Sequence, residues 1–204
     1  MGDPFLDRGK QGGCAFHRWR YSGPMRARQT LPNLWLLSDR RNDGVLEQAL
    51  ARLPRGSGFV FRHYHLGEAE RRARFRQLAA IARRFDHCVI LSSDRWDDAV
   101  TWGSDGLYAA PATLAGLRPP GLLWLATAHD AREIAAAQRS GADGLFLSPV
   151  FPTRSHPGAR TLGVEGFRRL ALDSDLPVIA LGGMNADRAR ELDWPRWAAI
   201  DGLS

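Results

Sequence analysis

From residue 34 onward, short apolar runs alternate along the chain with stretches that mix apolar and charged residues. Eight runs, each nearly continuous in hydrophobicity, fall at 34–38, 58–62, 88–92, 106–109, 122–127, 144–150, 177–182 and 197–200. Uninterrupted apolar runs of this length are typical of parallel strands that are covered on both faces. The pattern therefore predicts eight parallel strands.

The stretches between these runs carry the signals of amphipathic helices. Residues 69–85 place alanine, leucine and isoleucine along one side and arginines on the other. A further helix is predicted between Asp130, which suits an N-cap, and Gly141, which suits a C-cap. The ranges 163–172 and 186–194 follow the same pattern. Strands and helices that alternate over about 170 residues predict a small (β/α)8 TIM barrel of the α/β class.

An open, doubly wound sheet is the alternative arrangement. Such a sheet usually carries a glycine-rich turn after its first strand, whereas this chain has Ser38-Asp39-Arg40-Arg41 there. We therefore favour one barrel domain over residues 31–204. Because the eighth run lies close to Ser204, we expect the last helix of the barrel to be missing. Either the N-terminal segment or a second subunit of a homo-oligomer would then cover that groove.

The first 30 residues differ from the rest, because they are rich in glycine, arginine and aromatic residues without a clear period. Six of their side chains are basic and two are acidic, so residues 1–30 carry +4 of the chain's net charge of +6. We expect a basic, flexible arm or a lid on the barrel. A basic arm can bind nucleic acid, but Lys10 is the only lysine in the chain. This arginine bias indicates codon usage rather than a nucleic-acid site.

Several classes of protein do not fit the composition. No apolar run approaches the roughly 20 residues that cross a bilayer, and the start of the chain lacks the apolar core of a secretory signal. Two cysteines, Cys14 and Cys88, do not make a disulfide framework. We therefore expect a cytoplasmic protein that does not enter the membrane.

Two loops that follow late strands carry the chemistry of an anion site. Thr153 and Ser155 offer hydroxyl donors, and the backbone amides of Gly182 and Gly183 can approach an anion closely. In parallel barrels, the loops after late strands frequently hold a phosphate. The sequence therefore predicts a phosphate site, although the glycine pair could instead serve only a tight turn.

Short motifs at the strand ends keep one order and spacing across residues 34–204. They are Leu34–Arg40, Ser93-Asp94-Arg95, Gly103–Gly106, Thr127-Ala128-His129, Gly141–Thr153, Leu162–Glu165 and Ala180–Met184. Together they resemble the thiamine phosphate synthase/TenI family. The resemblance implies a TIM barrel of thiamine biosynthesis that binds a thiazole phosphate. Synthases of the family couple that ligand to a pyrimidine pyrophosphate with Mg²⁺, whereas TenI-type members tautomerise a thiazole carboxylate phosphate.

The resemblance also implies roles for individual residues. Those implied for phosphate binding are Thr153, Arg154, Ser155, Gly182 and Gly183. Those implied for the pyrimidine and pyrophosphate side are Arg62, Ser93, Thr127 and His156. Arg62 would also act in catalysis of coupling, Asp94 would be a magnesium ligand, and His129 would shuttle the proton in tautomerisation.

The chain departs from the synthase pattern mainly around the metal and the pyrophosphate. Asp94 matches one magnesium carboxylate, but the second is missing from the stretch Ala109–Thr113. The glutamine, glutamate and lysine around Arg62 in the family are replaced by Val60, His63 and Tyr64. Mg²⁺ is therefore a weakened expectation. The resemblance still makes synthase-like coupling with a degraded metal and pyrophosphate site the first expectation, and tautomerisation through His129 the alternative, although coupling has lost more of its residues than tautomerisation has.

A further departure affects the phosphate site. Asp201 stands where the family offers the serine of a Val-Ser pair, and a carboxylate a few Å from a phosphate repels it. Either Asp201 turns away or the site has changed its ligand. A barrel that binds a phosphorylated metabolite or a partner protein without catalysis is thus a further alternative.

Structural roles compete with the functional ones at several of these positions. His129 could be a polar residue at a helix start, and Asp94 could be the N-cap of a helix over 96–102. His63 and His65 flank Tyr64, and we interpret them as rim residues rather than as a metal-binding pair.

Overall fold

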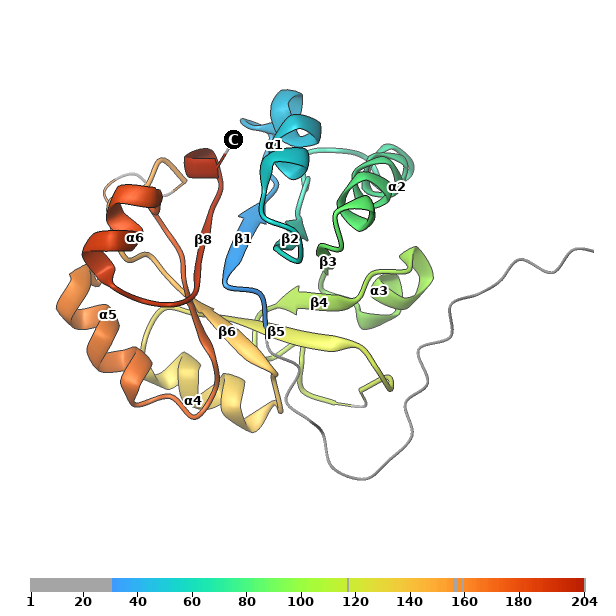
Figure 1. The fold of residues 1–204 in the computed structure, drawn as a ribbon. Coiled ribbons are helices and arrows are strands. Elements are labelled where there is room, and N and C mark those ends of the chain that lie inside the picture. Colours follow the sequence, from blue (N-terminus) through green and yellow to red (C-terminus); the bar gives the residue numbers. More distant parts are fainter. Residues whose placement is uncertain (1–30, 117, 156–157, 159, 204) are drawn as a thin grey trace, which may run out of the picture.

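Eight parallel strands close into a barrel and follow one another around it in sequence order (Figure 1). The computed structural model describes residues 31–203 except 117, 156, 157 and 159, so the predicted arm over 1–30 lies outside the described residues. The strands are β1 (Leu34–Leu37), β2 (Gly58–Phe61), β3 (Cys88–Ser92), β4 (Gly106–Ala109), β5 (Leu123–Ala128), β6 (Gly144–Leu147), β7 (Val178–Ala180) and β8 (Trp197–Ala199). Pairing of Leu34 with Trp197 joins β1 to β8 and closes the ring. The predicted TIM barrel is confirmed.

Helices surround the barrel on its outside (Figure 1). They are α1 (Leu46–Arg52), α2 (Glu68–Arg84), α3 (Trp96–Trp102), α4 (Ala131–Arg139), α5 (Gly163–Leu172) and α6 (Ala186–Leu192), with short 3₁₀ turns η1 (Asp43–Val45) and η2 (Asp201–Leu203). The residues described between β4 and β5 form turns instead of a helix, and η2 is the element that follows β8.

Small shifts separate the predicted elements from the observed ones. β6 ends at Leu147, before the end of the apolar run 144–150. The strand stops there because Pro149 cannot donate a ladder hydrogen bond and the chain turns. The Asp130 carboxylate accepts a hydrogen bond from the backbone N–H of Glu133 at 2.8 Å, which confirms its N-cap role. Asn185 caps α6 in the same way, with a bond of 2.9 Å from the Arg188 N–H.

The strands bury apolar side chains on both faces, as the uninterrupted runs predicted. Inside the barrel, the Trp35 ring meets the Phe146 ring edge to face at 5.5 Å, and the Tyr108 ring does the same at 5.0 Å. The outer cluster lies between strands and helices and includes Leu36 and Phe167. None of the helices in the described ranges has both the length and the apolar character needed to span a bilayer.

Asn42 ties the last strand of the barrel to the first. Its buried side chain donates to the carbonyl oxygens of Leu37 at 3.1 Å and Ile200 at 3.0 Å. Its amide oxygen accepts a hydrogen bond from the Asp39 N–H at 2.8 Å. These bonds satisfy backbone groups at the point where β1 and β8 end. The loops that follow both strands are thereby held next to each other.

His63 is buried, so its interpretation as a rim residue was wrong. Its Nδ1 lies 2.8 Å from Ser38 Oγ, and its Nε2 lies 2.8 Å from Asp43 Oδ1. Its ring stacks on Phe61 at 4.7 Å. His63 lies on the side of the helix layer, because Phe61, on which it stacks, packs against Phe75 of α2, whereas Arg62 lies at the barrel mouth. His65 is exposed.

The environment of His63 leads to an expected pH dependence of stability. Burial lowers the pKa of His63, although the hydrogen bond to Asp43 opposes this change. The unfolded chain, in which the histidine pKa is about 6.5, therefore binds the proton more tightly than the folded protein does. As the pH falls from about 7.5 through that unfolded value, the free energy of unfolding should decrease.

Denaturant unfolding between about pH 7.5 and pH 5 measures this effect. The variant His63→Gln should lose part of the pH slope, because the group that titrates has been removed. The comparison variant His65→Gln removes an exposed histidine whose ring lies 5.1 Å from that of His63 and whose charge lowers the pKa of His63, so it should reduce the slope less than His63→Gln does. An unchanged slope in His63→Gln would show that His63 does not cause the effect.

Candidate functional site

The loops at the carboxyl ends of the strands enclose a pocket of about 630 Å³. It opens at the barrel mouth, the end where the active sites of such barrels are found. Residues after β2, β5, β6, β7 and β8 contribute to its wall. The predicted site residues that line it are Arg62, Thr127, His129, Thr153, Arg154, Ser155, Gly182 and Gly183. The fold therefore brings most of the predicted residues into one cavity.

Two predicted residues lie away from this lining. Ser93 Oγ donates to Asp98 Oδ2 at 2.7 Å and accepts from the Arg95 N–H at 3.1 Å, so it organises the start of α3. Asp94 is exposed, and within the described ranges it forms no hydrogen bond or ion pair. The N-cap of α3 is Arg95, so the alternative role of Asp94 as that cap was wrong. His156 lies outside the described residues.

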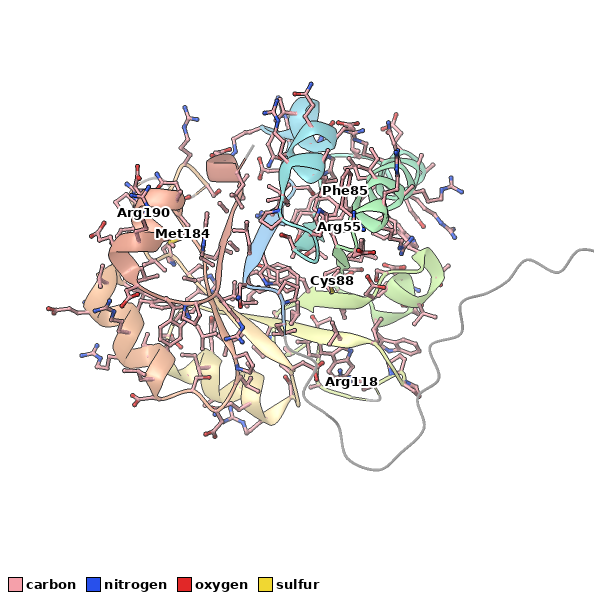
Figure 2. The ribbon with its side chains drawn as sticks, in the orientation of Figure 1. Arg55, Phe85, Cys88, Arg118, Met184 and Arg190 are labelled. Carbon is pink, nitrogen blue, oxygen red and sulfur yellow. The ribbon has the colours of Figure 1, made fainter. Side chains whose placement is uncertain are left out.

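The glycine pair after β7 packs directly against the loop after β6. Gly182 and Gly183 have φ values of 94° and 65°, the left-handed region that glycine adopts without a steric penalty. A Cβ at Gly182 would lie 2.7 Å from Pro149 Cα, and a Cβ at Gly183 would lie 2.5 Å from the Pro152 carbonyl oxygen. The next residue, Met184, is buried beside α6 (Figure 2). The pair is thus needed for packing of the two loops that form the predicted phosphate site.

Arg188 adds a cation to this side of the pocket. It was not among the predicted site residues. It lines the pocket from the first turn of α6, and its guanidinium donates to the carbonyl oxygen of Gly183. Its guanidinium carbon lies 5.1 Å from the centre of the Phe151 ring, a cation–π arrangement. Its position one helical turn after Gly182 and Gly183 was the sequence signal that could have identified Arg188 as a pocket residue. Together with Arg154, it gives this wall two guanidinium groups.

Asp201 also lines the pocket, but its carboxylate is paired. Asp201 Oδ2 lies 3.4 Å from Arg41 Nη1, and the same guanidinium donates to Ser155 Oγ at 2.8 Å. No motif in the sequence marked Arg41 as a candidate site residue. The carboxylate that was expected to repel a phosphate therefore faces a compensating positive charge.

His129 forms a dyad with Glu133 at the edge of the pocket. Its Nδ1 lies 2.7 Å from Glu133 Oε2, which also accepts a hydrogen bond from the His129 backbone N–H at 2.8 Å. A carboxylate at Nδ1 favours the tautomer with a proton there, so Nε2 becomes the proton acceptor. Glu133 was not predicted as a site residue. Its position four residues after His129, at the start of a helix, could have indicated that the two side chains are in contact.

Aromatic rings occupy the side of the pocket where the family resemblance implied a pyrophosphate. Tyr64 and Tyr108 line the pocket together with Arg62, whose guanidinium carbon lies 5.6 Å from the centre of the Tyr64 ring. The Tyr64 hydroxyl is hydrogen-bonded to Ser92 Oγ. Burial raises the pKa of Tyr108 well above its ordinary value, so its phenol stays neutral. This wall offers aromatic surface and one cation.

Comparison with known proteins identifies the family. The sequence profile described as thiamine monophosphate synthase matches residues 34–194, which include most of the barrel. The chain belongs to this family. The resemblance stated from the strand-end motifs is therefore confirmed.

Relatives in the thiamine monophosphate synthase family match over most of their length. The thiamine-phosphate synthase of Pyrococcus furiosus is 30% identical over 166 residues, which cover 78% of this chain and 79% of the relative. A putative thiamine-phosphate synthase 2 of Aquifex aeolicus is 27% identical over 78% of this chain and 89% of its own. Among solved structures, a thiamine phosphate pyrophosphorylase from Pyrococcus furiosus aligns with a TM-score of 0.68 and 27% identity, covering 86% of this chain and 88% of that one.

The donor set at the barrel mouth does not fit the Mg²⁺ that the resemblance to synthases implies. Magnesium prefers carboxylate and phosphate oxygens. Asp94 lies outside the pocket lining, and apolar Ala109 and Ala110 occupy the end of β4. Across the part of the chain that the structure describes, no three His, Cys, Asp or Glu side chains are grouped to hold a metal. The described residues at the barrel mouth therefore do not supply the carboxylate set that a magnesium ion needs.

Proposed function

We propose that this chain is an enzyme of thiamine biosynthesis that binds a thiazole phosphate in the barrel-mouth pocket. The reaction that its residues support best is a TenI-type tautomerisation, in which His129 moves a proton on the bound thiazole. The observation that carries this proposal is that His129, which is paired with Glu133, lines the same cavity as Thr153 and Ser155.

The phosphate would bind where the loops after β6 and β7 meet. The hydroxyls of Thr153 and Ser155 and the guanidinium groups of Arg154 and Arg188 line this wall. Hydrogen bonds to a charged phosphate are stronger than neutral ones, and arginine forks suit phosphate oxygens. These groups would hold the ligand in one orientation, with its thiazole ring toward the aromatic side of the pocket.

The proton transfer would use the ring nitrogen that faces away from Glu133. His129 Nε2 would take a proton from one atom of the thiazole system and return it to another. The product would therefore contain the same atoms as the substrate, and no group would leave. The Glu133 carboxylate would stabilise the imidazolium that forms in between. A tautomerisation of this kind requires neither a second substrate nor a leaving pyrophosphate.

Coupling to the pyrimidine pyrophosphate is the second candidate, because several relatives are thiamine-phosphate synthases and Arg62 lines the pocket. The pyrophosphate side, however, presents Tyr64 and Tyr108 where coupling needs groups that stabilise a departing pyrophosphate. The residues therefore favour tautomerisation over coupling.

Turnover assays separate the candidates. The protein is incubated with the thiazole carboxylate phosphate alone, and in parallel with thiazole phosphate, pyrimidine pyrophosphate and Mg²⁺. Formation of the tautomer would support the proposal, whereas release of pyrophosphate in the parallel reaction would support coupling. Binding of thiazole phosphate by calorimetry without any turnover would instead indicate a non-catalytic barrel.

A further inference from the structure

Three loops at the barrel mouth converge on the guanidinium group of Arg41. Its Nε donates to Asp39 Oδ1 at 2.9 Å, and its Nη2 donates to Ser155 Oγ at 2.8 Å. Its Nη1 lies 3.4 Å from Asp201 Oδ2. These three partners follow β1, β6 and β8 in the chain. Because a guanidinium group holds its donors in a fixed plane, one side chain sets the positions of all three partners.

The charge of Arg41 matters because Asp201 lines the same pocket as Thr153 and Ser155, the predicted phosphate ligands. Asp201 and Ser155 both belong to the lining, whereas Arg41 stands behind them. Two negative charges a few Å apart repel strongly at the effective dielectric of a protein surface. A bound phosphoryl group would meet that repulsion from Asp201 if no cation were paired with the carboxylate.

Arg41 is itself held in place by its neighbour in the β1 loop. The Asp39 carboxylate accepts hydrogen bonds from both the backbone N–H and the Nε of Arg41. Burial opposes ionisation of Asp39, but these hydrogen bonds and the nearby positive charge outweigh it, so the pKa of Asp39 is lowered. The carboxylate is therefore charged at neutral pH. The Arg41 side chain, with an exposed fraction of 33%, is anchored rather than free in solvent.

We propose that Arg41 is a positioning residue of the phosphoryl site. It acts through its two lining partners: it offsets part of the charge of Asp201, since the same guanidinium also pairs with Asp39, and it holds the Ser155 hydroxyl toward the ligand. The ligand class that this arrangement accepts is a phosphate monoester. The inference rests on the proposed function in so far as that function places a phosphoryl group against Ser155.

Calorimetry with inorganic phosphate and with thiazole phosphate tests this role. The variants are Arg41→Ala, Asp201→Asn, the double variant that carries both changes, and Arg40→Ala. Arg40 is the matched control, because it is the adjacent arginine and is exposed. Arg41→Ala should weaken the binding of both ligands by about tenfold or more, since it removes a cation that is paired with Asp201 beside the anion. Arg40→Ala should change either affinity by less than about twofold.

The double variant distinguishes charge compensation from a general loss of structure. Removing the carboxylate of Asp201 should restore most of the affinity that Arg41→Ala loses, whereas a disordered loop would not be repaired by that change. Equal affinities of Arg41→Ala and Arg40→Ala, or no recovery in the double variant, would overturn the role of Arg41.

The same measurements separate this inference from the proposed function. A wild-type protein that binds phosphate, loses it in Arg41→Ala and turns over neither substrate would keep the role of Arg41 and contradict the enzyme. A wild-type protein that binds no phosphate at all would overturn the anion site, and the role of Arg41 with it.

Discussion

Replacing His129 with alanine is expected to lower the rate of thiazole tautomerisation by about a hundredfold or more, the usual contribution of a positioned acid–base group. The expected loss is in kcat, because His129 contacts Glu133 at the pocket edge, whereas the proposed phosphate ligands belong to the loops after β6 and β7. Affinity for thiazole phosphate should therefore stay within about threefold of the wild type. Turnover measured by following both tautomers, together with calorimetric binding, checks this split.

Two further variants sharpen the test of His129. His65→Ala removes an exposed histidine that does not line the pocket, so its turnover should match the wild type. Glu133→Gln keeps a hydrogen-bond acceptor near Nδ1 but removes the charge that stabilises an imidazolium, so it should lose activity to a smaller extent than His129→Ala. Unchanged turnover in His129→Ala would remove its role and favour a different proton carrier.

The second large effect is expected from Gly183→Ala, which should both destabilise the protein and abolish phosphate binding. The added Cβ would meet the Pro152 carbonyl oxygen at 2.5 Å and Phe151 Cβ at 2.9 Å, at a residue with φ of 65°. Strain from the left-handed backbone and overpacking together should reduce the free energy of unfolding by about 2–5 kcal/mol. The loop after β6 would have to move away, and it carries Thr153 and Ser155. Denaturant unfolding and phosphate calorimetry measure the two effects.

Gly56→Ala is the matched control for the backbone contribution. Gly56 has a φ of 76°, but a Cβ there would meet nothing within 4 Å. This variant should lose only about 1 kcal/mol and keep its affinity for phosphate. If Gly183→Ala behaved like Gly56→Ala in both measurements, the contact between the two loops would not control the site.

The hydrophobic pattern was sufficient to predict the barrel and the order of its elements. Strands that are covered on both faces are apolar throughout, and consecutive apolar residues such as those of β3 and β6 reveal them in the sequence. Cap residues such as Asp130 act on backbone groups only a few positions away. Local rules therefore located these elements, with bounds that shifted by a few residues at their ends.

The sequence also located much of the candidate site, because the ends of parallel strands meet at one mouth of a barrel. Thr153, Ser155 and the glycine pair could be placed there from the strand order alone. The strand order did not predict which of these side chains point into the pocket. Ser93 follows β3 as predicted, but it organises the start of α3 rather than lining the cavity.

Only the tertiary structure decided which charges meet. Arg41 and Ser155 are 114 positions apart in sequence, and their hydrogen bond exists because β1 and β6 belong to the same closed ring. The burial of His63 against Ser38 and Asp43 likewise depends on how the loops after β1 and β2 pack together. Propensity and periodicity act over a few residues, whereas the partner of a polar side chain is selected by closure of the barrel, which brings distant segments within hydrogen-bond range. The chain by itself thus determined a barrel and predicted a phosphate site at its mouth, and the three-dimensional packing determined which cation faces the acidic residue there.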